Sequence, residues 1–223
     1  MGTSVNFQLL NVLNGNWTVT GVQTFAGGVT VFGGATLNVP DTLNATVNVL
    51  AAGQLTGAGT IGGLVNAGTV APGNSIGTLT VNGNVNFLPG SFYQVEANAA
   101  GQSDKIVATG TATLAGGTVQ VLAENQAYAR QTRYTILTAN GGVIGTFADV
   151  TSNLAFLTPT LTYDPNDVFL TLNRNDITFA SVAQTPNQRA VAGALDRSPL
   201  FSPPVQAVVN LTGASAQIGR AHV

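Results

Sequence analysis

The distribution of charge is the feature that most restricts what this chain can fold into. Between Met1 and Val95 the only charged side chain is Asp41, and charged residues make up 7% of the 223 residues, against roughly 25% in an ordinary globular domain. Disordered chains are rich in charge and poor in β-branched residues, and this composition is the reverse. We therefore expect stacked strands whose outer faces carry rows of Asn, Thr, Ser and Gln.

The apolar residues of this stretch alternate over short segments that end in Gly, Asn or Pro. Examples are NWTVTG, GGVTVFGG, ATVNVLAAG and GTLTVNG. Strands of about 3–5 residues with turns every 6–10 or so are typical of a β-sandwich or of a β-solenoid. The unequal, glycine-rich spacing and the missing hairpin dipeptides favour the solenoid, in which corner glycines supply positive φ angles.

The pattern changes between Ser91 and Leu172, where the alternating segments become longer. Three of the four Tyr and most of the charged side chains lie between Glu96 and Arg174. A solenoid needs a terminal cap because its last coil otherwise exposes an open sheet edge. The sequence therefore predicts β-helix coils over residues 1–90 and a β cap over residues 91–176.

The last part of the sequence, residues 177–223, has helical rather than strand periodicity. Thr185 is a good N-cap before Pro186, and Val191 and Leu195 fall on one face of the expected helix. A similar arrangement at Ser202–Pro203 predicts a second short helix. The fold class expected is thus all-β with short C-terminal helices.

The overall composition excludes several classes of function. A net charge of −2 with no Lys/Arg stripe offers nothing to neutralise phosphates, so we expect no nucleic-acid partner. The absence of Cys excludes a disulfide framework, thiolate zinc sites and Cys nucleophiles, and it suits a chain that crosses an oxidising compartment unfolded. No apolar run approaches the ~20 residues of a membrane helix, and MGTSVNF has no features of a signal peptide.

One stretch imitates the nucleophile elbow of serine hydrolases. Gly73-Asn74-Ser75-Ile76-Gly77 matches G-x-S-x-G, in which the serine lies on a sharp turn between a strand and a helix. The residues after Ser75 alternate as a strand, and the only histidine is His222, near the end of the chain. Because a serine nucleophile needs a base in reach, we interpret Ser75 as a turn residue.

Other local patterns also have simpler explanations than chemistry. Gly57–Gly62 matches G-x-G-x-x-G, but neither a helix nor a nearby acid follows. Asp164 and Asp167 belong to a DPND turn whose acids are expected to bond their own backbone rather than a calcium ion. We expect no catalytic, cofactor or metal site and no cofactor, and we interpret the following as solvated strand ends: Asp104, Lys105, Arg130 and Arg133. Glycosylation sequons begin at Asn16, Asn44 and Asn210 and count for little in so Asn/Thr-rich a chain.

The stretch from Gly53 to Ile106 also carries a family resemblance. GQLTGAGTIGGLVNAGTVAPGNSIGTLTVNGNVNFLPGSFYQVEAN, followed by GQSDKI, resembles the passenger-associated transport repeat and C-terminal passenger region of monomeric type V autotransporters. In that family GTVAPGNSIGTLTV is similar to a signature coil, and GSFYQVEAN with SDKI is similar to the start of the autochaperone region. TFADV, TYDPNDVFLTLNRN and FASVAQTPNQRAVAGALD resemble its end, so that the resemblance extends to about Leu195.

This resemblance implies a right-handed parallel β-helix at the cell surface or outer membrane of a Gram-negative bacterium, either retained there or released outside the cell. It implies that residues 91–176 act as an autochaperone-like cap and that residues 177–223 lead to a β-barrel translocator. The implied partners are that barrel, the outer-membrane assembly machinery and periplasmic chaperones during export, and a host surface or neighbouring bacterial cells afterwards. Ligand-binding residues are not indicated.

Three functions are compatible with these observations. The first is a stalk and folding nucleus for surface display of an adhesin, which would not be an enzyme. The second is the stalk of a secreted enzyme whose catalytic domain lies N-terminal to these residues. The third, a carbohydrate-active β-helix, would require a cleft with clustered acids, bases or aromatic residues.

Overall fold

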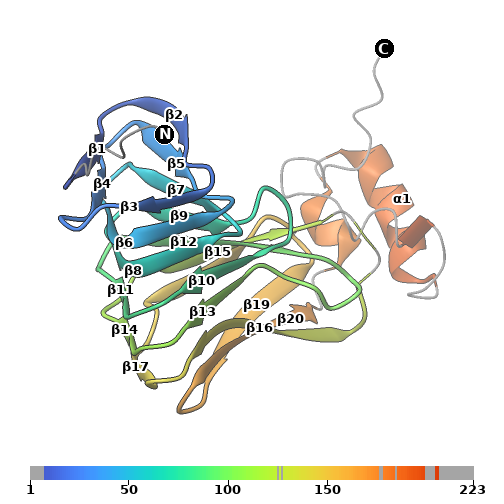
Figure 1. The fold of residues 1–223 in the computed structure, drawn as a ribbon. Coiled ribbons are helices and arrows are strands. Elements are labelled where there is room, and N and C mark those ends of the chain that lie inside the picture. The colour runs from blue at the N-terminus through green and yellow to red at the C-terminus, as the bar shows by residue number, and fades with distance from the viewer. Residues whose placement is uncertain are drawn as a thin grey trace.

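A computed structural model describes residues 8–198 of the chain, except 125, 127, 176, 177 and 184, together with residues 204 and 205. In this part the backbone winds into a parallel β-helix whose coils stack from the N-terminal strands towards a hairpin at the opposite end (Figure 1). The predicted all-β, parallel β-helical architecture is confirmed.

The strands of successive coils form two sheets. The 7-stranded sheet, called sheet B here, has the order β18 (Asp149–Ser152), β15 (Thr118–Ala123), β12 (Phe92–Ala97), β9 (Thr69–Pro72), β7 (Gln54–Gly57), β5 (Ala35–Asn38) and β2 (Gly15–Thr18). The 13-stranded sheet, sheet A, has the path β1 (Leu10–Val12), β4 (Val29–Val31), β6 (Thr42–Val49), β8 (Thr60–Asn66), β10 (Thr78–Val81), β13 (Lys105–Ala108), β16 (Gln131–Ala139), β20 (Asp167–Arg174) and β19 (Leu157–Tyr163). Its remaining strands pair beside this path: β3 (Val22–Thr24), β11 (Val85–Phe87), β14 (Ala112–Leu114) and β17 (Val143–Gly145).

Alternation along each strand builds the core. In β5, Ala35 and Leu37 are buried while Thr36 and Asn38 remain partly exposed, as period-2 side-chain geometry requires. Because pairing is parallel and in register, like positions of neighbouring coils stack into an inward column: Leu37, Leu55, Val70, Tyr93 and Val119, all 0% exposed. Each such side chain contributes roughly 1.5–3 kcal/mol by leaving water.

Glycine is required where coils turn or approach closely. Gly57 has φ +109°, and a Cβ there would lie 2.3 Å from the Val39 carbonyl oxygen of the coil below. A Cβ on Gly59 would lie 2.0 Å from the Asp41 carbonyl oxygen. The Gly57–Gly62 segment therefore joins β7 to β8 by close backbone packing, with no helix after it.

The coils lengthen towards the C-terminal end. The hydroxyl of Thr56 donates to Asn38 across 18 residues of sequence, whereas the backbone N–H of Ala123 donates to the Asn153 side chain across 30 residues. Unequal coil length explains why the repeat is so irregular in the sequence.

The stack ends in antiparallel pairing. β16 pairs in parallel with β13 on one side and antiparallel with β20 on the other, and β19 pairs antiparallel with β20. This hairpin covers the edge of β16 that faces away from the parallel strands of sheet A (Figure 1). Parallel pairing continues from β12 through β15 to β18, so strand direction does not change at residue 90. The expected boundary between the β-helix coils and the β cap, at residues 90/91, stays a prediction.

An α-helix follows the β structure in the described part of the chain. Helix α1 (Pro186–Asp196) begins as expected, with Thr185 accepting a hydrogen bond from the Gln188 backbone in a capping box. Its buried face is Gln188, Ala192 and Leu195; Val191, expected on that face, is 50% exposed. A 3₁₀ turn, η1 (Phe179–Val182), is held to α1 through Asp196, which accepts from the backbone N–H groups of Phe179 and Ala180.

The second predicted helix, at Ser202–Pro203, lies largely outside the described residues. Among the helices that the structure describes, none has the length and hydropathy needed to cross a membrane.

Candidate functional site

The outward face of sheet B carries a row of uncharged polar side chains. The Thr36 hydroxyl donates to Gln54 at 3.4 Å, and Gln94 donates to Gln120 at 3.1 Å, each pair joining neighbouring coils. These contacts confirm the expected polar rows. They satisfy amide and hydroxyl groups from coil to coil without any charge.

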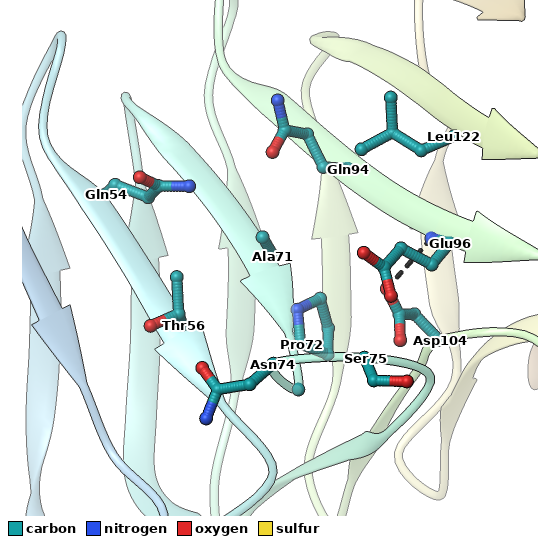
Figure 2. A pocket seen from close by; sticks show the side chains of 11 residues that line it. Gln54, Thr56, Ala71, Pro72, Asn74, Ser75, Gln94, Glu96, Asp104 and Leu122 are labelled. Atoms are coloured by element: carbon teal, nitrogen blue, oxygen red, sulfur yellow. Dashed lines mark hydrogen bonds between the residues drawn. The ribbon is translucent and has the colours of Figure 1, made fainter. Parts of the chain in front are cut away.

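The row is interrupted at Ala71, where an open cavity of about 210 Å³ lies on the sheet. We call it the Ala71 hollow. Figure 2 shows Ala71 and Pro72 between Gln54 and Thr56 on one side and Gln94 and Glu96 on the other. Polar side chains around it are Gln54, Thr56, Asn74, Ser75, Gln94 and Glu96, and Leu122 forms an apolar wall.

Asp104 lies at the inner edge of the hollow and is 1% exposed, so its interpretation as a solvated strand end is wrong. Its Oδ1 accepts from the backbone N–H of Gly77 and its Oδ2 from that of Glu96, both at 2.8 Å. The main-chain N–H of Asp104 also donates to the Glu96 carbonyl. One carboxylate thus joins the turn of one coil to strand β12 of the next.

Burial raises the pKa of Asp104 from 3.8 to about 7. The two backbone N–H groups act in the opposite direction because they stabilise the ionised form, and the neighbouring Glu96 charge raises the pKa again. Burial, then the charge of Asp104, also raises the pKa of Tyr93 well above its ordinary value. An acid directly before a strand, in a chain so poor in charge, was the only sequence signal of this buried carboxyl.

Ser75 lies in the turn that bounds the hollow, and it is exposed. The turn leads into β10 rather than a helix, which confirms the strand predicted after Ser75. Within the described residues the Ser75 hydroxyl makes no hydrogen bond to an acid or base, and His222 lies outside them. The serine therefore has the position of a turn residue. Gly73, with φ +82°, allows the bend, since a Cβ there would lie 2.0 Å from the Ser75 carbonyl oxygen.

Asp164 and Asp167 form the turn that the sequence predicts. The Asp164 Oδ1 accepts from the backbone N–H groups of Asn166 and Asp167 at 2.9 and 2.7 Å. The Asp167 carboxylate accepts from the Thr138 hydroxyl. In the described ranges, no three His, Cys, Asp or Glu side chains gather in a way that could hold a metal ion.

Of the basic candidates, Lys105 is the partly exposed first residue of β13, whereas Arg130 and Arg133 lie just before and on β16. Arg133 is exposed and places its guanidinium 3.8 Å from the centre of the Phe169 ring. Arg130 is exposed on the preceding turn, and its carbonyl accepts the backbone N–H of Arg174. Burial, then the charge of Arg130, lowers the pKa of Arg174. Of the sequons, Asn16 and Asn44 lie on exposed strand positions, and Asn210 is outside the described residues.

A buried aromatic cluster joins the coils near the hairpin. The ring centres of Phe87 and Phe147 are 5.1 Å apart in an edge-on arrangement, and Tyr93 lies 5.5 Å from Phe87. The Tyr93 hydroxyl donates to the carbonyl of Ile136 on β16. Two further buried tyrosines, Tyr128 and Tyr134, donate to the carbonyls of Ala97 and Asn98. Buried aromatic rings with satisfied hydroxyls therefore join these coils by packing and by hydrogen bonds.

Comparison with known proteins relates this chain to extracellular proteases. The chain is similar to part of two extracellular serine proteases. Both are from Serratia marcescens; one is 42% identical over 156 residues, which is 65% of this chain, and the other is 37% identical over 133 residues, or 56% of it. The chain spans 15% and 13% of the length of these relatives. No family model matches the chain.

These similarities support a relation to autotransporter passengers and to extracellular proteins. They do not identify a transport repeat or an autochaperone region. They correct the expectation that the protein is not an enzyme, because both relatives are named serine proteases. That expectation was based on these 223 residues alone, whereas each relative is several times longer than the segment that it shares with this chain.

Proposed function

We propose that this chain is a passenger segment of a secreted, serine-protease-type autotransporter, and that it serves as the β-helical stalk. The 42% identity to an extracellular serine protease carries the proposal. In this proposal the proteolytic residues belong to another segment of the longer protein, and the stacked coils hold that segment away from the cell surface. The predicted translocator barrel, assembly machinery and chaperones are the export partners that it requires.

We further propose that residues 91–176 fold first and template the coils before them. Three tyrosine hydroxyls bond across coils in this region, and the β19–β20 hairpin covers the edge of β16. An ordered coil then offers unpaired backbone groups to the next segment, and each added coil buries apolar side chains. Because each coil contacts only its neighbours, folding can advance stepwise away from the hairpin.

The proposal can be tested on the intact chain with its own chromophores. The only Trp is Trp17 in β2, 58% exposed at the N-terminal end of the stack. All four Tyr lie between positions 93 and 163. During equilibrium unfolding in urea, Trp fluorescence should change at lower denaturant concentration than the tyrosine signal in near-ultraviolet circular dichroism. Coincident transitions would contradict folding from the C-terminal end.

A variant with a displaced reporter provides the control. In W17F/F92W the Trp moves to β12, where Phe92 is 37% exposed. Its fluorescence should follow the tyrosine transition. Fluorescence that still changes early would show that the first transition is not confined to the N-terminal coils.

A further inference from the structure

The Ala71 hollow is a gap in an otherwise continuous row of side chains. Asn38, Thr56 and Ala71 occupy matching positions in successive coils, and Gln94 and Gln120 occupy them in the coils beyond. Four of these five positions carry amides or hydroxyls that reach a neighbouring coil. At Ala71 a single methyl group leaves the sheet uncovered, with Pro72 beside it.

The groups around the gap are neutral hydrogen-bonding side chains and one available carboxylate. Both oxygens of Asp104 are occupied by backbone N–H groups. Glu96, which is partly exposed, has no hydrogen bond to its carboxylate among the described residues. Among the residues that the structure describes, no Lys, Arg or His lines the hollow. An anionic ligand therefore finds no counter-charge, and a single free carboxylate is a poor set of ligands for a metal ion.

The remaining chemistry matches a polyol. Amide and hydroxyl groups can both donate to and accept from sugar hydroxyls, and a carboxylate can accept from two neighbouring hydroxyls. Leu122, 39% exposed, offers apolar surface to the C–H face of a sugar ring. The cavity of about 210 Å³ is below the range of roughly 300–1,000 Å³ typical of drug-sized ligands, which suits one ring.

From these features we infer that the Ala71 hollow binds one sugar residue of a neutral oligosaccharide, with Glu96 accepting two of its hydroxyls. Adjoining sugar residues lie along the polar row of sheet B, over Thr56 and Gln94. Binding is weak for a single sugar, with a Kd on the order of 1 mM, because no aromatic ring lines the hollow. It strengthens with the length of the oligosaccharide as more of the row is contacted.

Filling the hollow provides a direct test. A71Q would complete the row with a side chain that can bond to Thr56 and Gln94, so the fold is retained. The control is T30Q, which adds a similar side chain at a partly exposed position of β4, on sheet A. Saturation-transfer NMR and titration calorimetry would use tetrasaccharides built from glucose, mannose, galactose or N-acetylglucosamine, and ethylguanidinium as a cationic probe.

The proposal expects wild type and T30Q to bind at least one neutral tetrasaccharide, A71Q to lose at least tenfold in affinity, and E96Q to lose several-fold. Near-ultraviolet circular dichroism should be the same for all four proteins. Failure of the wild type to bind any of the sugars, or unchanged binding by A71Q, would overturn the proposal. Binding of ethylguanidinium alone would also overturn it and assign the hollow to a cationic group.

Discussion

Asp104 gives the fold a pH dependence that can be calculated from the structure. Its pKa rises from 3.8 to about 7 on folding, chiefly through burial. Between these two values the folded chain holds the proton more tightly than the unfolded chain. The contribution of Asp104 to the free energy of unfolding is therefore full below pH 3.8 and is lost as pH rises through about 7.

The size of this fall follows from the shift. One pKa unit corresponds to 1.36 kcal/mol, so a shift of about three units gives about 4 kcal/mol, and partial solvation beside the exposed turn reduces this to roughly 2–4 kcal/mol. Other ionisable side chains close to Asp104 are Glu96 and Tyr93 of β12 and Lys105, the first residue of β13. The segment from Ala71 to Val81 contains no ionisable side chain. A variant altered only at Asp104 separates its contribution from theirs.

D104N supplies that comparison. The amide stays neutral at every pH, so the variant should lose this part of the pH dependence. It should also carry a constant penalty of about 1–3 kcal/mol, because the amide –NH₂ cannot accept the bond that one of the two backbone donors makes. Urea unfolding from pH 4.5 to 8.5 measures both effects. D149N, which removes an exposed carboxylate of β18, is the control and should follow the wild-type curve. Equal pH slopes for D104N and wild type would refute the reasoning.

Three further predictions concern the core and the cap. Y93F should lower the free energy of unfolding by about 1–2 kcal/mol in urea, because it removes the donor to the Ile136 carbonyl; an unchanged midpoint would contradict that role. D164A should lower the free energy of unfolding by about 1 kcal/mol, since two backbone N–H groups lose their acceptor. Thermal unfolding measures this effect, and an unchanged Tm would contradict it. An unpaired charge in the core should lower the free energy of unfolding by more than about 4 kcal/mol and abolish surface display of the longer protein; the variants that test this are V119D, V121D and L170D. Q120D, on the outward face of β15, should preserve display. Normal display of the three core variants would argue against folding from this end.

The sequence was sufficient for the architecture because local signals agreed. Alternation around Leu37 and Leu55, glycines at corners such as Gly57, and the near absence of charge all indicate short strands stacked in one direction, and the structure confirms it. The same reasoning separated Ser75 from a nucleophile, because the strand after it was visible in the alternation. The capping signal at Thr185 was equally local.

What the sequence could not provide depends on contacts between distant residues. Asp104 is buried by a turn 27 residues earlier, and nothing in the SDKI segment records that distance. The Ala71 hollow exists only because Gln54 and Gln94 come to lie on either side of one alanine. Val191 lies at a helical spacing from Leu195, yet α1 turns a different face towards Phe156 and Phe179.

Aromatic contacts and tyrosine hydrogen bonds between coils lie near the hairpin, and the proposed folding order is argued from them. Near the hairpin, rings of Phe87, Tyr93 and Phe147 pack together and tyrosine hydroxyls bond across coils. At the opposite end, Leu13 and Trp17 are 61% and 58% exposed. Because a coil gains stability only from the coils beside it, the proposal expects the N-terminal coils to open at lower cost than the coils near the hairpin. In this proposal, each coil that is added to the capped end makes the folded part of the chain more stable.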